Sequence, residues 1–415
     1  MRRLLPLLLL IISVTASSAA DPTHTTYPWE DCQGSAKPYP VPANPIEHPD
    51  TLTPVMINHV GRHGARFPAS PKHSATITDA LKKAAEAGTI TPKGRELLAV
   101  AQLVAEQSAG RWGALDSLGM AEQRGIASRM YASYPQLFNR GSISAISTYS
   151  PRCIMSMYEF THQIARLDNN VEINTSSGRQ YSPLLRFFDL NDEYKALIKS
   201  ETVSETIKKF MRETLTLEPL KRVLGEKYPF GDDALDIAMA EYSTIAGLQA
   251  MDMYIDITRF LTQQEYNALW QVFNLRQYLT HSASTLSALP AQIASPLLSD
   301  LIDTTDRFIA GNAPAVNLRF AHAETLMPLL ALMHLRDCYY LTNYFDTVGL
   351  HWRDFHIVPM AANLQMILFR SDSGRYYVRT DLNEVPVALI PNDNSIYIEW
   401  NRARTYLERC LPLAY

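Results

Sequence analysis

Two arginines and a histidine stand together directly after an apolar stretch near the start of the chain. Residues 54–60 are mostly apolar and predict a buried strand. Arg62, His63 and Arg66 follow it, with neighbouring glycines that mark a sharp turn out of the strand. Guanidinium groups match phosphate oxygens in pairs, and nearby cations disfavour protonation of the histidine, which keeps a nucleophilic lone pair. These residues predict an anion site that contains a nucleophile.

Another arginine occupies the same kind of position later in the chain. Residues 143–149 predict a strand and residues 153–167 predict a helix, with Ser150-Pro151-Arg152 between them. A phosphate bound there would meet both the guanidinium of Arg152 and the N–H groups that open the helix. Because ligands bind at the carboxyl ends of strands in open α/β sheets, we expect Arg152 to join the first group.

His322 and Glu324 follow a further predicted strand, residues 316–321. The helix expected over 325–335 holds Pro328, a residue type that is tolerated in the first turn of a helix. A histidine can donate to phosphate oxygens, and a carboxylic acid two residues later can protonate a departing alkoxide. A buried histidine beside a helix N-terminal glutamate would give the same pattern without a catalytic role.

The stretch Arg62-His63-Gly64-Ala65-Arg66-Phe67-Pro68 resembles the active-site motif of the histidine acid phosphatases. His-Ala-Glu at 322–324 and the residues 184–189 are similar to the branch that acts on inositol polyphosphates, whereas many other members have His-Asp. The resemblance implies that His63 becomes phosphorylated and that Glu324 is the proton donor. It also implies a set of phosphate-binding side chains: Arg62, Arg66, Arg152 and His322.

Further basic residues lie outside these motifs. Lys72 adds positive charge after the first motif and is a candidate for the mouth of the pocket, although a solvated loop residue fits equally well. The lysines and arginines between 199 and 228 are balanced by glutamates, so we expect most of them to form a solvated helix face. A few of them are candidates for lining a substrate channel.

The resemblance implies an α/β fold of the phosphoglycerate-mutase-like kind, a three-layer core with a mainly parallel sheet and a helical insertion. Strand patterns on both sides of an almost continuous helical stretch favour the same division. We expect residues 21–190 and 290–415 to form the core and residues 191–289 to form a helical insertion, or cap. Closing strands are expected at 355–364 and 376–379.

The composition, with 47% hydrophobic and 19% charged residues in a chain of 415, is that of an ordinary globular protein. Residues 1–20 have the pattern of a signal peptide, with two arginines, an apolar run too short to cross a bilayer, and small residues at the end. Without those arginines the formal charge of −4 becomes −6, so general nucleic-acid binding is not expected. We expect an exported monomer, periplasmic or secreted, without a membrane span.

No metal or other cofactor is expected, because fixed arginines supply the positive charge that phosphoryl transfer needs. Zinc deaminases share the pattern His-x-Glu, but the sequence lacks their Pro-Cys-x-x-Cys partner and also lacks His-Glu-x-x-His. The four cysteines of an exported chain permit two disulfides in three connectivities, although Cys153 fits a buried free thiol equally well. They are Cys32, Cys153, Cys338 and Cys410.

The resulting hypothesis is a phosphomonoesterase that hydrolyses inositol polyphosphates, such as phytate, through a covalent phosphohistidine. Its partner is a small phosphorylated substrate. Two alternatives stay open within enzymes, a broad-specificity acid phosphatase and a phosphosugar phosphatase. A third is a protein that binds phosphorylated ligands without turnover, which would need neither His63 nor Glu324.

Overall fold

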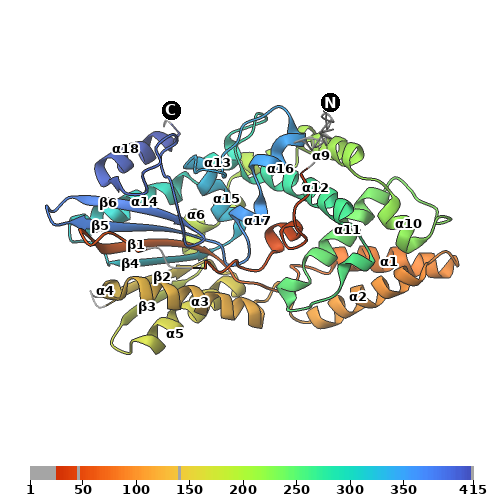
Figure 1. The fold of residues 1–415 in the computed structure, drawn as a ribbon, viewed down its shortest axis with the longest axis horizontal. Coiled ribbons are helices and arrows are strands. Elements are labelled where there is room, and N and C mark those ends of the chain that lie inside the picture. The colour runs from red at the N-terminus through yellow and green to blue at the C-terminus, as the bar shows by residue number, and fades with distance from the viewer. Residues whose placement is uncertain (1–24, 44–46, 139–141, 413–415) are drawn as a thin grey trace, which may run out of the picture.

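A mixed β-sheet occupies one half of the molecule in the computed structural model, which describes residues 25–43, 47–138 and 142–412 (Figure 1). Within those residues the strand order is β3-β2-β4-β1-β5-β6-β7, with β8 paired to β6. The neighbours β3, β2, β4 and β1 run parallel, whereas the pairings among β1, β5, β6, β7 and β8 are antiparallel. The strands are β1 (Leu52–Arg62), β2 (Ser142–Ser147), β3 (Glu172–Ser177), β4 (Val316–Ala321), β5 (Asn363–Ser371), β6 (Tyr376–Leu382), β7 (Val385–Val387) and β8 (Ile398–Glu399).

Helices cover both faces of this sheet. On one face α3 and α5 bury apolar side chains such as Ile126 and Phe160 against Ile57 and Leu318 of the sheet. On the other face α14, α15 and α18 share an apolar cluster with the opposite side of β1, which includes Val60. The predicted α/β class with a three-layer core is therefore confirmed. These helices are α3 (Ser117–Ser133), α5 (Pro151–Leu167), α14 (Ser295–Ile309), α15 (Ala323–Leu332) and α18 (Trp400–Cys410).

The other half of the molecule is a helical lobe (Figure 1). In α1 the side chains of Ile77, Ala80, Leu81 and Ala84 recur on one face and are buried, as the spacing of an amphipathic helix requires. They share one apolar cluster with residues of α2, α10, α11 and α12. The main lobe helices are α1 (Lys72–Glu86), α2 (Pro92–Ser108), α9 (Glu201–Thr214), α10 (Glu218–Leu224), α11 (Ala234–Ala246) and α12 (Gln263–His281).

This packing bears on the expected division of the chain. The helices α1 and α2 precede the expected insertion, 191–289, yet they pack with its helices α10 to α12. The boundaries of core and insertion stay a prediction. Short helices connect the larger elements: α4 (Pro135–Phe138), α6 (Ser182–Leu185), α7 (Phe187–Leu190), α8 (Asp192–Leu197), α13 (Leu289–Gln292), α16 (Val348–His351), α17 (Asp354–Ile357), η2 (Asp31–Ala36), η3 (Arg179–Tyr181), η4 (Gln249–Met251), η5 (Ile257–Arg259) and η6 (Phe345–Thr347).

Two local predictions are wrong. The strand expected at 355–364 is instead the short helix α17, a turn and the start of β5 at Asn363. Pro359 and the positive φ of 53° at Ala361 prevent the chain from extending earlier. Pro328 is not in the first turn of its helix, because α15 already begins at Ala323. At that depth a proline cannot donate to the carbonyl of Glu324, four residues earlier.

Three further expectations concern the signal peptide, a membrane span and the cysteines. The predicted signal peptide, 1–20, lies outside the described residues. Across the ranges that are described, no helix is both long and apolar enough to cross a membrane. The cysteines are all free, and Cys153 is buried, which agrees with the second of the two interpretations given for it. They are Cys32, Cys153, Cys338 and Cys410.

Candidate active site

The loop that leaves β1 is held by hydrogen bonds from both neighbouring helices. The amide N–H of Ala65 donates to the Glu122 carboxylate at 2.7 Å, and the side-chain amide of Gln123 donates to the Arg62 carbonyl at 3.0 Å. The N–H of Gly64 donates to the hydroxyl of Ser156 at 3.1 Å. Because α3 and α5 are packed on the sheet, these bonds fix the loop to the core.

Two glycines allow α3 to approach this loop closely. A Cβ atom at Gly64 would lie 2.4 Å from the carbonyl oxygen of Gly119, and a Cβ atom at Gly119 would lie 2.1 Å from the carbonyl oxygen of Ala65. Neither distance is possible for a real Cβ atom. The backbones of the loop and the helix therefore touch, and a side chain at either position would push the loop away.

His63 lies at the centre of this loop, 2% exposed. Its Nδ1 is 2.9 Å from the carbonyl oxygen of Gly64, which can only accept, so Nδ1 carries the proton. The other ring nitrogen, Nε2, then holds the lone pair. Burial lowers the pKa of His63 well below the ordinary value, and the charges of Arg62, Arg66 and Arg152 lower it further. The ring is thus neutral, with Nε2 as a potential nucleophile.

Three guanidinium groups surround His63. Nη1 of Arg62 donates to the carbonyl oxygens of Ser35 at 2.6 Å and Val358 at 2.5 Å, which fixes the orientation of its guanidinium. Burial lowers the pKa of Arg62 and of Arg66 to about 10, so both stay charged near neutral pH. The Nε atoms of Arg62, Arg66 and Arg152 are buried and have no hydrogen-bond partner among the described residues. Unsatisfied buried donors are costly, and an anion placed among them would satisfy them.

His322 faces His63, with their ring centroids 5.8 Å apart. Its Nδ1 lies 3.3 Å from Nη2 of Arg152, and its Nε2 lies 2.8 Å from Nη1 of Arg186. Burial lowers the pKa of His322 to about 3; Glu324 opposes this shift, and Arg152 reinforces it. A neutral imidazole has one N–H and one lone pair, so it cannot accept hydrogen bonds from both guanidiniums at once. A phosphate oxygen would give the donors of this group a common acceptor.

Glu324 is the second residue of α15, close to His322. Burial raises the pKa of its carboxyl, but the nearby His322 and His281, its own backbone N–H and the charge of Arg62 together lower it to about 2. The carboxylate is therefore ionised in the ligand-free protein at ordinary pH. It can act as a proton donor only if binding of an anionic ligand raises its pKa.

The structure brings most of the candidate residues into one cluster, but not all of them. Lys72 is exposed at the start of α1 and has no side-chain hydrogen bond or ion pair within the described residues. Arg186 contacts His322 directly and is not one of the predicted site residues, although it lies in the stretch 184–189 that resembles the family. It follows a short helix rather than a predicted strand. The expectation that site residues follow the carboxyl ends of strands therefore does not predict it. The clustered candidates are Arg62, His63, Arg66, Arg152, His322 and Glu324.

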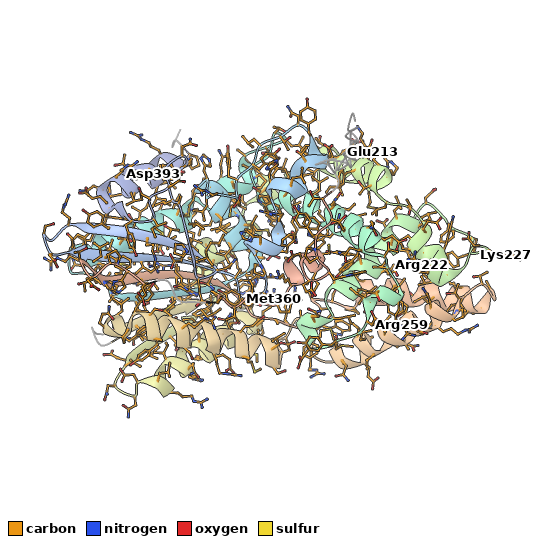
Figure 2. The ribbon with its side chains drawn as sticks, in the orientation of Figure 1. Glu213, Arg222, Lys227, Arg259, Met360 and Asp393 are labelled. Atoms are coloured by element: carbon orange, nitrogen blue, oxygen red, sulfur yellow. The ribbon has the colours of Figure 1, made fainter. Side chains whose placement is uncertain are left out.

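Three basic residues of the helical lobe lie away from this cluster. Met360 packs against Ala65 in the loop that leaves β1 and marks the boundary between sheet and lobe, whereas Arg222, Lys227 and Arg259 lie toward the far end of the lobe (Figure 2). Arg222 forms an ion pair with Glu265 at 2.6 Å. These positions agree with a solvated, ion-paired helix surface.

No group of three or more His, Cys, Asp or Glu side chains suited to a metal ion occurs among the described residues. The positive charge of the cluster comes instead from guanidinium groups. Such an arrangement of fixed donors around a neutral, buried histidine can bind a tetrahedral oxyanion and attack it.

The fold and this cluster of side chains agree with the protein family that the sequence matches. The model of the histidine phosphatase superfamily, branch 2, matches residues 55–383. The chain therefore belongs to this superfamily, which confirms the predicted family and the predicted class of enzyme, a phosphatase.

Among curated relatives, the chain is 24% identical over 372 residues to multiple inositol polyphosphate phosphatase 1 of Gallus gallus, covering 84% of this chain and 80% of the relative. It is 25% identical over 396 residues to the protein of the same name in Homo sapiens, with 87% and 81% covered.

Two solved structures share the fold. The first is multiple inositol polyphosphate phosphatase of Bifidobacterium longum in complex with phosphate, with a TM-score of 0.72, 19% identity, and 91% of this chain and 97% of that chain covered. The second is the phytase from D. castellii, with a TM-score of 0.65, 15% identity, and 97% and 90% covered.

Proposed function

We propose that this protein hydrolyses inositol polyphosphates, including phytate, through a phosphohistidine at His63. The observation that carries the proposal is the fixed tautomer of His63. Because Nδ1 donates to the Gly64 carbonyl at 2.9 Å, the lone pair of Nε2 is available in a cluster of guanidiniums. The choice of substrate is supported by the names of the relatives, multiple inositol polyphosphate phosphatases and a phytase.

In the first step, Nε2 of His63 attacks phosphorus while the bond from phosphorus to the inositol oxygen breaks. Charge on the transferring group spreads over its equatorial oxygens, and fixed donors stabilise that charge without reorganisation. The unpartnered Nε atoms of the arginines support their role as these donors. The proposed phosphate-binding residues are Arg62, Arg66, Arg152 and His322.

Glu324 is the proposed proton donor to the departing inositol oxygen. Its pKa of about 2 in the ligand-free protein would keep it ionised, so it must gain a proton when the substrate binds. A phosphate group brings negative charge next to the carboxylate and offsets the charge of the arginines. Both effects raise the pKa of the carboxyl. The donor is therefore formed in the complex with substrate.

In the second step, water attacks the phosphorus of phosphohistidine and the bond from nitrogen to phosphorus breaks. Glu324, ionised after the first step, accepts the proton of the water, and inorganic phosphate leaves. His63 returns to its neutral form. Because arginines supply the positive charge, neither step calls for a metal ion.

The proposal extends to the setting of the reaction. The signal-peptide pattern at 1–20 supports export to the periplasm or the exterior. The acidic net charge supports a small-molecule substrate rather than nucleic acid. We propose a monomer.

Single-turnover kinetics with two substrates test the role of Glu324. An inositol alkoxide needs a proton as it leaves, whereas p-nitrophenolate scarcely does. Glu324→Gln should slow the first step with phytate by about 10²–10⁴-fold and largely spare the burst of p-nitrophenol. Glu205→Gln, an exposed carboxylate on α9, is the matched control and should behave like the wild type. Equal loss with both substrates would assign Glu324 a positioning role instead.

A further inference from the structure

Each of the parallel strands of the sheet delivers a side chain of the cluster at its carboxyl end, except that β3 has no assigned contribution. β1 ends at Arg62 and is followed by His63, β4 is followed by His322, and β2 is followed by Tyr149 and Arg152. The chain leaving β3 enters η3 at Arg179, on the same edge of the sheet. The order β3-β2-β4-β1 places Arg179 at the end of this row.

Arg179 is joined to the cluster through an aromatic ring. Its guanidinium carbon lies 4.6 Å from the ring centre of Tyr149, and the guanidinium carbon of Arg186 lies 4.8 Å from the same centre. Arg186 in turn reaches His322 at 2.8 Å. A guanidinium held on an aromatic ring keeps its donors in one plane and loses less freedom when it binds an anion. A row of guanidiniums thus extends from the surroundings of His63 and His322 outward to the surface.

Arg179 and Arg186 differ in whether a carboxylate neutralises their charge. Arg186 forms an ion pair with Asp189 at 2.6 Å, but Arg179 is exposed and forms no ion pair among the described residues. Two guanidiniums near one tyrosine repel each other, and one carboxylate does not neutralise both. An additional anion at this position would stabilise the pair.

We propose that Arg179 and Arg186, held on Tyr149, form a second phosphate site for a group of the substrate that does not react. This inference rests on the proposed inositol polyphosphate substrate. Strands are about 4.8 Å apart, so β3 lies about 15 Å from β1. The side chains of Arg179 and Arg186 shorten that distance, because both lie on Tyr149 and Arg186 reaches His322. A substrate with several phosphates on one ring can therefore place one phosphate at His63 and another near these arginines. A substrate with a single phosphate does not use the second site.

Steady-state kinetics with phytate and p-nitrophenyl phosphate test this site. A contact that is equal in ground state and transition state affects KM and not kcat. Arg179→Gln should raise KM for phytate about 5–10-fold with kcat unchanged, and should leave KM for p-nitrophenyl phosphate within twofold. Tyr149→Leu should raise KM for phytate in the same way, whereas Tyr149→Phe, which keeps the ring, should match the wild type. The control is Arg166→Gln, an exposed arginine in the last turn of α5.

Two results would overturn the inference, and a third concerns the substrate itself. If Arg179→Gln has the same KM for phytate as Arg166→Gln, no second phosphate binds there. If both substrates lose activity equally, Arg179 has a structural role. If the wild type cleaves p-nitrophenyl phosphate but not phytate, the proposed substrate is wrong, and the inference fails with it.

Discussion

Replacing Gly119 by alanine tests whether α3 fixes the position of the catalytic loop. The new Cβ atom would lie 2.1 Å from the carbonyl oxygen of Ala65, where real Cβ atoms come no closer than 3.0 Å. The loop must therefore retreat by about 1 Å, and His63 moves with it because it is two residues away. A displacement of about 1 Å at a reacting group costs on the order of 10²-fold in rate. We expect kcat to fall by about that factor.

The assay measures kcat for p-nitrophenyl phosphate and phytate, together with the free energy of unfolding in denaturant. Alanine is the better helix former by about 1 kcal/mol, which offsets part of the strain in α3, so Gly119→Ala should stay folded. The control is Gly125→Ala in the same helix. Its Cβ atom would meet Nη1 of Arg129 at 3.1 Å, the mobile end of a long side chain. This variant should keep full activity.

A particular result would refute the reasoning. If Gly119→Ala is folded and keeps kcat within threefold of the Gly125→Ala control, the close approach of loop and helix does not position His63. The hydrogen bonds of Ala65 and Gly64 would then suffice for that task.

Three further predictions concern pH, ligands and stability. Because the pKa of His63 is lowered, kcat/KM for p-nitrophenyl phosphate should persist as the pH falls below 6.5 and should decline only in stronger acid; a midpoint at or above 6.5 would contradict this. A chelator should leave activity intact and vanadate should inhibit competitively, whereas loss on chelation that zinc or magnesium restores would favour a metal. Burial lowers the pKa of His59 to about 3, so between about pH 6.5 and 3 the unfolded state binds more protons than the folded state. The free energy of unfolding therefore decreases as the pH falls through this range. His59→Leu should reduce that slope by up to about 1.4 kcal/mol per pH unit, measured by denaturant unfolding, and an unchanged slope would contradict it.

Much of the site could be predicted because it follows one rule of parallel sheets. Arg62, Arg152 and His322 each come just after a strand that apolar residues make evident, and such strand ends lie on one edge. The strand β3 could not be predicted in this way, because residues 172–177 are polar and partly exposed and show no apolar pattern. Arg179 therefore had no strand in front of it to mark its position.

Packing and charge could not be predicted from the same patterns. The back-to-back approach of Gly64 and Gly119 joins residues distant in sequence, and nothing local distinguishes these glycines from those of ordinary turns. The expected strand at 355–364 failed because a proline and a left-handed residue interrupt an apolar run. The lowered pKa of Glu324 depends in part on His281, which is distant in the sequence and lies on α12.

Covalent labelling of His63 tests the central claim most directly. The protein is mixed with radiolabelled phytate or p-nitrophenyl phosphate, quenched within milliseconds in alkaline denaturant, digested and mapped by mass spectrometry. The account predicts phosphate on His63, stable in base and lost in acid. With p-nitrophenyl phosphate this label accumulates further in Glu324→Gln, because water is no longer activated in the second step. It also predicts no label and no turnover in His63→Ala. Label on a serine, an aspartate or another histidine, or turnover by His63→Ala, would contradict the account.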